Sequence, residues 1–333
     1  MVEHQHLIVS NGDIDIAVDL ATSGTDLATS NEIASRGTVV CVAGWPELGR
    51  SWRHQQRHLV ERGYRVATVD VRGYGASSAP PEVERYTLRE LSGDIAAVAE
   101  SVSDDPAVVL CHDWGAPIGY HTAIRHPDSV AAVIGLSVPH MAPNGSSPIE
   151  MLDLLYADRF FYMLYFARPG VAEADFGRDL RGSLKRCFWA LSGDAPAGAW
   201  TPDAPRDASL LDLLPPCPDG PLSFLPDDEL DALVSAFERT GMTGAFNRYR
   251  ASALDAAADL DIVGARVGQP SCFIAGALDP VRNMVPGVDL YSEAGADCSE
   301  FRGTTLIPGA GHWVHQEAIA ATNAAIDAFV DSL

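Results

Sequence analysis

Basic residues are scarce in this chain, whereas acidic residues are abundant. Its 333 residues include 23 Lys and Arg against 45 Asp and Glu, which gives a formal net charge of −22, and Lys185 is the single lysine. A surface this acidic repels phosphate groups, so nucleic acids and anionic membranes are poor partners. A neutral small molecule meets no such barrier. We interpret the lack of lysine as a coding bias or an adaptation to salt.

Cysteines are few, and long apolar runs are missing. No two of the cysteines have CxxC spacing, and three of them fall in apolar, strand-like runs, so we expect reduced thiols in the cytoplasm. The six positions are Cys41, Cys111, Cys187, Cys217, Cys272 and Cys298. The first residues lack the basic segment and apolar run of a signal peptide. No apolar run reaches the roughly 18 residues that a membrane-spanning helix needs.

Motifs that hold cofactors are also missing. The ten histidines show no HExxH or comparable spacing, so we expect no metal. The glycine-rich stretch DVRGYGASS (70–78) lacks both GxGxxG and GxxxxGK[ST], the patterns of nucleotide-binding loops. The sequence therefore predicts a protein without a cofactor.

Apolar runs of strand length alternate with helix-length segments in two parts of the chain. The first part opens with an expected hairpin over 6–9 and 14–19, followed by a loop over 21–37. Further strands are expected at 38–43, 65–70, 107–111, 130–136, 271–277 and 301–307, and helices at 51–62, 87–102, 116–126, 286–294 and from 317. Buried runs separated by helices are typical of a mostly parallel, doubly wound sheet.

The alternation stops between residues 140 and 265. This stretch contains aromatic-rich helical segments and a Pro/Asp-rich segment (195–228), with no convincing strand. We therefore predict an α/β core made of residues 1–139 and 266–333. An all-helical cap, 140–265, is inserted after the sixth strand of that core.

The pentapeptide Cys-His-Asp-Trp-Gly (111–115) lies between a buried strand and a helix. A catalytic nucleophile on a sharp strand-to-helix turn has this setting, and small residues on either side let the backbones approach. Asp113 holds the nucleophile position. A carboxylate attacks sp³ carbon well and gives an alkyl ester. The alternative is that Asp113 only caps the helix.

Two further residues favour catalysis over capping. Asp279 and His312 each follow a predicted parallel strand, at the end of the sheet where ligands bind in α/β proteins. The order nucleophile, acid, histidine is that of a Ser-His-Asp-type triad on this kind of sheet. Asp279 would orient His312, and His312 would act as general base. The backbone N–H groups of Trp45 and Trp114 are the expected oxyanion donors.

The chain resembles the epoxide hydrolases of the α/β-hydrolase superfamily, of the soluble mammalian and actinobacterial kind. The resemblance rests on core and cap motifs along most of the chain. They are GWPELGRSWRHQ, DVRGYGASS, HDWG, GALDPV and GHW in the core, and FFYMLYFARPGVAEADF and NRYR in the cap. It implies an eight-stranded, mostly parallel sheet and a small lipophilic epoxide as substrate. It also implies that the cap tyrosines Tyr162 and Tyr249 activate the epoxide oxygen.

The resemblance extends to the pocket, with two departures. Phe166, Trp114 and Trp313 are expected to line an apolar pocket, although Phe166 also suits simple packing of cap on core. The family usually has His where Ala43 stands and Gly where Cys111 stands. The first departure concerns the shape of the oxyanion turn, and the second is a small change at the nucleophile turn.

Other interpretations stay open at this point. A dehalogenase shares the Asp nucleophile and the ester intermediate, and a non-catalytic ligand-binding protein could keep the same fold. The sequence leaves open the physiological epoxide, the regio- and enantioselectivity, and whether the chain forms a homodimer. His112, beside the nucleophile, is expected to be a structural hydrogen-bonding residue rather than a base.

Overall fold

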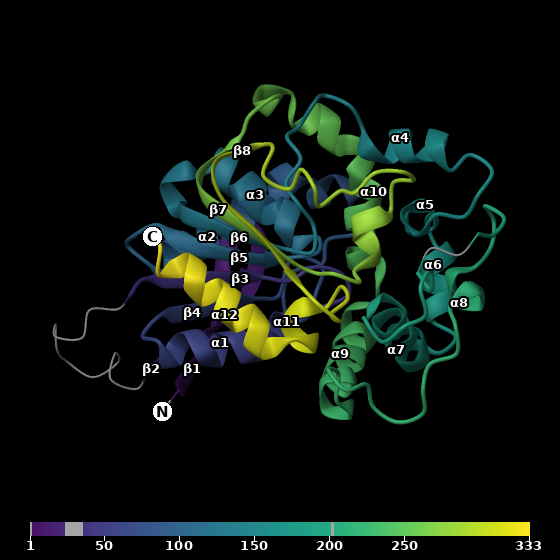
Figure 1. Ribbon diagram of the computed structural model, residues 1–333, viewed down its shortest axis with the longest axis horizontal. Coiled ribbons are helices and arrows are strands. Elements are labelled where there is room, and N and C mark those ends of the chain that lie inside the picture. The colour runs from purple at the N-terminus through teal and green to yellow at the C-terminus, as the bar shows by residue number, and fades with distance from the viewer. Residues whose placement is uncertain (1, 24–35, 201–202) are drawn as a thin grey trace.

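The computed structural model describes residues 2–23, 36–200 and 203–333, and its centre is one eight-stranded sheet (Figure 1). The strands are β1 (Val2–Asn11), β2 (Ile14–Ser23), β3 (Thr38–Val42), β4 (Arg65–Val69), β5 (Ala107–His112), β6 (Val130–Leu136), β7 (Val267–Gly276) and β8 (Cys298–Ile307). Their order is β1-β2-β4-β3-β5-β6-β7-β8. β2 pairs antiparallel with β1 and β4, and every later pair is parallel. This confirms the predicted fold class.

Alternate residues of the central strands enter two separate cores. Val39 and Cys41 of β3 pack with α1 (Arg53–Glu61) and α12 (Ile319–Val330) on one face. Val40 and Val42 pack on the other face, with α2 (Leu88–Val102) and α3 (Gly115–Arg125). All of β3 and β5 is buried, as expected of strands covered on both faces.

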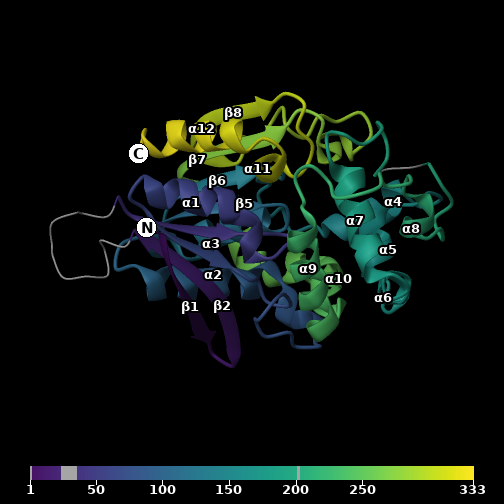
Figure 2. The same cartoon turned by 90° about the horizontal axis from the view of Figure 1, so that it is seen from below.

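The chain between β6 and β7 is helical. Its helices are α4 (Pro148–Leu155), α5 (Tyr162–Ala167), α6 (Val171–Phe176), α7 (Leu180–Leu191), α8 (Leu210–Leu213), α9 (Asp227–Thr240) and α10 (Thr243–Ala258). Within the described part of 140–265, β-structure is limited to two isolated bridges. Helices α5 to α8 gather at one end of the molecule, and both termini lie at the opposite end (Figures 1 and 2). The part of the chain described contains no helix with the length and apolarity to cross a bilayer.

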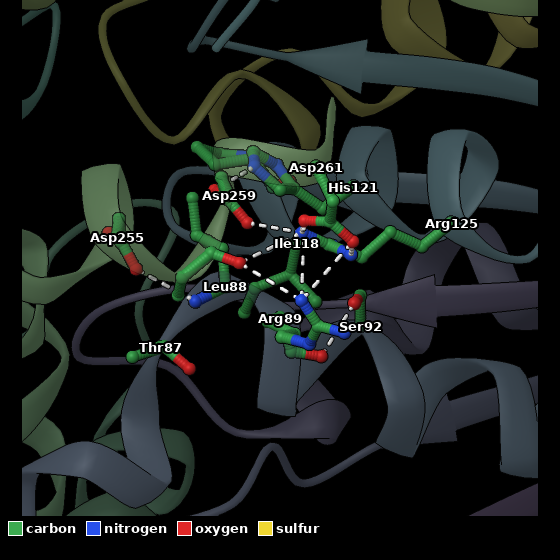
Figure 3. A network of polar contacts seen from close by, with 12 residues as sticks. Thr87, Leu88, Arg89, Ser92, Ile118, His121, Arg125, Asp255, Asp259 and Asp261 are labelled. Atoms are coloured by element: carbon green, nitrogen blue, oxygen red, sulfur yellow. Dashed lines mark hydrogen bonds and ion pairs between the residues drawn. The ribbon is translucent and has the colours of Figure 1, made fainter. Parts of the chain in front are cut away.

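A polar network ties the C-terminal end of α10 to α3 (Figure 3). His121 Nε2 and Arg125 Nη2, both on α3, lie 3.0 and 2.8 Å from the carboxylate of Asp259 at the end of α10. Arg125 and Arg89 also pair with Asp261. These contacts fix the C-terminal end of α10 to α2 and α3.

Two sequence-based expectations were wrong. Residues 286–294 form turns instead of a helix, because Gly287 has a φ of +76° and the side chain of Asp289 accepts a hydrogen bond from the backbone N–H of Tyr291. Arg282 pairs with the same carboxylate. β2 continues to Ser23, inside the predicted loop 21–37, and residues 24–35 of that loop lie outside the described residues. The six cysteines are all free, as expected.

Candidate active site

Asp113 occupies a strained turn between β5 and α3. Its φ is +52°, a left-handed conformation that costs a non-glycine residue free energy and is common at functional sites. The turn leaves 16 % of the side chain exposed, although the residues on either side are mostly buried. The local fold therefore presents this carboxylate at the carboxyl end of the parallel strands.

Small residues around Asp113 make the turn possible. A Cβ at Gly115 would lie 2.2 Å from the carbonyl oxygen of Val42, so only glycine fits at the start of α3. A Cβ at Gly44 would lie 2.4 Å from Asp113 Oδ1. Cys111 fits where the family usually has glycine because Gly119 faces it. A Cβ at position 119 would lie 2.8 Å from the Cys111 Sγ.

The structure brings Asp113, His312 and Asp279 together. His312 Nε2 lies 3.2 Å from Asp113 Oδ2, and His312 Nδ1 lies 3.0 Å from Asp279 Oδ2. Asp279 is 2 % exposed and also accepts hydrogen bonds from the Val281 backbone N–H and the Tyr291 hydroxyl. An ionised carboxylate on one imidazole nitrogen fixes the tautomer and leaves the other nitrogen free to accept a proton.

The two carboxylates determine the protonation of His312. Burial alone would lower its pKa, but the negative charge of Asp279 and the hydrogen bonds with Asp113 and Asp279 hold the pKa of His312 well above its usual value. Esterification of Asp113 would remove one of these two charges. The pKa of His312 would then fall, because one of the charges that stabilise its protonated form would be gone.

The loop after β3 supplies a hydrogen bond to the nucleophile. The backbone N–H of Trp45 donates to Asp113 Oδ1 at 2.7 Å, and the Glu47 N–H donates to the Gly44 carbonyl at 2.9 Å, which closes the turn. The Trp114 backbone nitrogen, in the turn between β5 and α3, lies 2.4 Å from where a Cβ at Gly44 would be. Its role as second oxyanion donor stays a prediction.

Tyr162 and Tyr249 approach Asp113 from two cap helices. Their ring centroids are 6.3 Å apart, and the Tyr249 ring also meets the Trp114 ring edge-on at 5.4 Å. Burial and the nearby charge of Asp113 raise the pKa of both tyrosines well above the usual value. Both hydroxyls are therefore protonated at neutral pH and can donate hydrogen bonds.

The three expected pocket residues have different surroundings. Trp114 is partly buried and lies beside Tyr249. Phe166 is fully buried, with its ring centroid 4.7 and 4.9 Å from those of Trp45 and Tyr249, so its contacts are those of a packing residue. Trp313 is fully buried and stacks on Phe188, to whose carbonyl its Nε1 donates a hydrogen bond. These Trp313 contacts are those of a core residue, and a direct contact with substrate stays a prediction.

Glu317 supports the loop that carries His312, and the sequence analysis missed it. Its carboxylate accepts hydrogen bonds from the backbone N–H groups of Gly311 and Trp313, on either side of His312, and of Gly193 in the cap. The His312 N–H donates to the Leu191 carbonyl at 2.9 Å, also in the cap. Glu317 lies four residues after Trp313 and six after Gly311, and this spacing is not a recognisable sequence motif. Only the structure therefore reveals its role.

His112 and Glu47 form a buried pair behind the triad. His112 Nε2 donates to the backbone carbonyl of His312 at 2.8 Å, and Nδ1 lies 2.7 Å from Glu47 Oε2. This agrees with the expected structural role of His112. Burial would raise the pKa of Glu47, but His112 and His315 hold that pKa well below its usual value. Glu47, like His315, was not singled out in the sequence.

Comparisons with known proteins agree with this geometry. The model of the alpha/beta hydrolase fold family matches residues 37–318. Epoxide hydrolase A of Mycobacterium tuberculosis is 36 % identical over 297 residues, covering 89 % of this chain and 90 % of the relative. Epoxide hydrolase 1 of Siraitia grosvenorii is 33 % identical over 319 residues, covering 93 % and 96 %.

Solved structures are similar over nearly the whole chain. Epoxide hydrolase A from Mycobacterium thermoresistibile superposes with a TM-score of 0.86 at 35 % identity, covering 98 % of both chains. An epoxide hydrolase from an endophytic Streptomyces gives 0.87 at 33 % identity, covering 99 % of this chain and 95 % of its own. The chain belongs to the α/β-hydrolase fold family. Within that family, its relatives named here are epoxide hydrolases.

Proposed function

We propose that this chain is an epoxide hydrolase that converts small lipophilic epoxides to vicinal diols through an ester on Asp113. One observation carries the proposal. Asp113 has one oxygen on the Trp45 N–H and the other on His312, while two neutral cap tyrosines lie close to it. The named relatives, which are epoxide hydrolases, support the same reaction.

In the first step, the Asp113 carboxylate attacks an epoxide carbon and the C–O bond of the ring breaks. Tyr162 and Tyr249 stabilise the leaving oxygen, and one of them gives it a proton, because a phenol is far more acidic than the alcohol formed. The product is a hydroxyalkyl ester of Asp113 and a tyrosinate, and the tyrosinate then takes the proton that His312 gives up as its pKa falls.

In the second step, His312 takes a proton from water and the hydroxide attacks the Asp113 carbonyl carbon. The Trp45 N–H, already directed at Oδ1, stabilises the oxyanion together with the N–H of Trp114. Collapse breaks the acyl–oxygen bond, and the diol oxygen takes the proton from His312. The second proton of the water passes from Asp113 to His312 and restores the starting protonation state, so protons balance and no cofactor takes part.

The domain division follows from these roles. We propose that residues 1–139 and 266–333 form the catalytic core and that 140–265 form a cap that carries the tyrosines and closes the pocket. We place the enzyme in the cytoplasm, since its thiols are unpaired and mostly buried. Whether two chains associate is left to a direct measurement of mass in solution.

The decisive experiment replaces His312 with Gln. Ester formation needs Asp113 and the tyrosines, whereas ester hydrolysis needs His312, so the variant should accumulate ester. Intact-protein mass spectrometry should show a gain equal to one whole epoxide, located in the peptide that contains Asp113. Asp113→Asn with the same epoxide is the control and should gain nothing.

The same experiment separates the alternatives. A dehalogenase would react with a haloalkane and gain only its alkyl group, because halide leaves. A ligand-binding protein would gain no covalent mass with either reagent. In heavy-oxygen water, a single turnover of the wild type should give a first diol whose new oxygen comes from Asp113. Solvent oxygen in that first diol, with no adduct on the variant, would disprove the ester mechanism.

A further inference from the structure

We infer that Glu47, His112 and His315 form a binding site for a divalent transition metal ion such as Zn²⁺, directly behind the catalytic triad. One ligand atom from each residue lies within 4.8 Å of the other two, and all three side chains are buried. The residues come from three segments: the loop after β3, the end of β5, and α11 (Val314–Glu317). No single stretch of sequence therefore carries a metal-binding pattern.

His315 is the residue that points to a ligand. Its ring is fully buried and packs on the Trp52 ring at 4.5 Å, and its Nδ1 has no hydrogen-bond partner. Its Nε2 has a long contact with Glu47 Oε1, at 3.3 Å. A buried imidazole without hydrogen bonds costs free energy, and coordination of a metal ion would recover it.

Hydrogen bonds from neighbouring groups orient the other two ligands, His112 and Glu47. His112 donates its Nε2 proton to the His312 carbonyl, which leaves Nδ1 directed at Glu47. Gln316 Nε2 donates to Glu47 Oε1 at 2.8 Å. Hydrogen bonds of this kind fix the orientation of ligating histidines and carboxylates.

The donor set and the distances suit a tetrahedral ion. Two imidazoles and one carboxylate favour Zn²⁺ or Co²⁺ over Ca²⁺ or Mg²⁺, which prefer oxygen donors. Neighbouring ligands around such an ion lie about 3.3 Å apart, given metal–ligand distances of about 2.0 Å. The distance from Glu47 Oε1 to His315 Nε2 already has this value, whereas His112 Nδ1 contacts the other oxygen, Oε2, so the carboxylate would turn to bring one oxygen to both histidines. The Glu47–His112 contact, at 2.7 Å, would open slightly as the ion replaces the proton between the two groups, and that proton would be released.

A small cleft lies beside Glu47. Its volume is about 20 Å³, it lies at the seam between core and cap, and both Glu47 and Gln316 line it. Arg50, at its outer side, is half exposed, and Leu233 of α9 lines the cap side. A water molecule from this cleft would complete the coordination. The strongly negative chain also raises the local concentration of cations.

The test uses Co²⁺ and Zn²⁺ with the full chain. His4 and His6 lie on an exposed strand beside Asp19 and could bind metal on their own, so the parent protein carries His4→Gln and His6→Gln. We expect the parent to bind one Co²⁺ with the strong visible absorption of tetrahedral coordination, and Zn²⁺ to raise its melting temperature. Zinc-edge X-ray absorption should find two imidazoles at about 2.0–2.1 Å.

His315→Gln in this background should lose the tetrahedral signal and the thermal shift, while His54→Gln, on α1 and outside the cluster, should keep both. Glu47→Gln should weaken binding in the same way. The inference is overturned if the parent shows only octahedral Co²⁺ at millimolar concentrations, or if His315→Gln binds as the parent does. None of these measurements uses a substrate, so the outcome is independent of the proposed hydrolase activity.

Discussion

The backbone N–H of Trp45 donates a 2.7 Å hydrogen bond to Oδ1 of Asp113, 68 positions further along the chain. The contact joins the loop after β3 to the nucleophile turn. It places the donor on the carboxylate oxygen that would become the carbonyl oxygen of the ester and then the oxyanion. In the proposed mechanism, the group that would stabilise the second step is therefore in position before the first step begins.

Replacing the cap tyrosines should slow the first step. Tyr162→Phe and Tyr249→Phe each remove one donor to the leaving oxygen, which should cost about 2–4 kcal/mol, or roughly 30- to 1000-fold in rate. The double variant should be nearly inactive. Single-turnover kinetics of ester formation measure the effect. Tyr165→Phe, on the same helix as Tyr162, is the control. Unchanged rates in the double variant would contradict the proposed role of the cap.

Gly44→Ala should disrupt the oxyanion turn. The added methyl group would lie 2.4 Å from both Asp113 Oδ1 and the Trp114 nitrogen, so the loop after β3 has to move away from the nucleophile. We expect kcat to fall by 100-fold or more, about the value of one oxyanion donor, with the fold retained. Gly268→Ala is the matched control, because a Cβ there meets nothing within 4 Å. Wild-type kcat in Gly44→Ala would show that this loop does not contribute to the reaction.

Glu317→Gln should loosen the loop that carries His312. A glutamine amide offers one acceptor oxygen and brings its NH₂ group against a backbone N–H, so a buried donor is left unsatisfied at a cost of about 1–3 kcal/mol. Glu317 acts here as a positioning residue, and ester hydrolysis should slow more than ester formation. The two steps are measured separately in a stopped-flow experiment, with Glu238→Gln on the exposed side of α9 as the control. An equal loss in both steps would indicate a general loss of stability instead.

His140 should make the protein sensitive to acid. Its ring is buried beside Tyr120, its Nε2 has no hydrogen-bond partner, and burial lowers its pKa from 6.5 to about 4. Between these two values the unfolded chain binds a proton that the folded chain does not, so stability falls as the pH drops from about 7 to 4. The full loss is on the order of 3 kcal/mol.

The acid effect is measured by urea unfolding at pH 7 and at pH 4.5. His140→Gln should lose less stability than the wild type over this interval, whereas the exposed control His6→Gln should follow the wild type. If His140→Gln and the wild type lose the same free energy, another group accounts for the acid sensitivity.

The sequence predicted the position of Asp113, Asp279 and His312 because each follows a strand, and the carboxyl ends of parallel strands meet at one edge of the sheet. The tyrosines were different. No period or spacing identifies Tyr162 and Tyr249, and only the resemblance to a family did so. The helix predicted at 286–294 was wrong for a local reason. The contacts of Asp289 with its neighbours favour turns there, and the composition of the segment does not reveal those contacts.

The supporting groups could not be predicted for a physical reason. Glu47, His315 and Glu317 act through contacts between loops that are distant in sequence, and each residue type there is also common on a protein surface. Their function depends on burial and on partners, which only the folded chain specifies. The residues that react are therefore easier to find from sequence than the residues that hold them in place.

The network of Figure 3 has a consequence for exchanging caps between relatives. Asp259 follows the last cap helix, but its partners His121 and Arg125 belong to the nucleophile helix of the core. A graft cut at the ends of the cap would separate these partners and leave the His121 ring and the Arg125 guanidinium facing a foreign loop. Tyr249 lies on the same helix as this anchor, so its distance to the nucleophile would change as well. A working chimera would need to transfer α10 together with the residues of α3 that contact it. The two helices therefore have to be exchanged together.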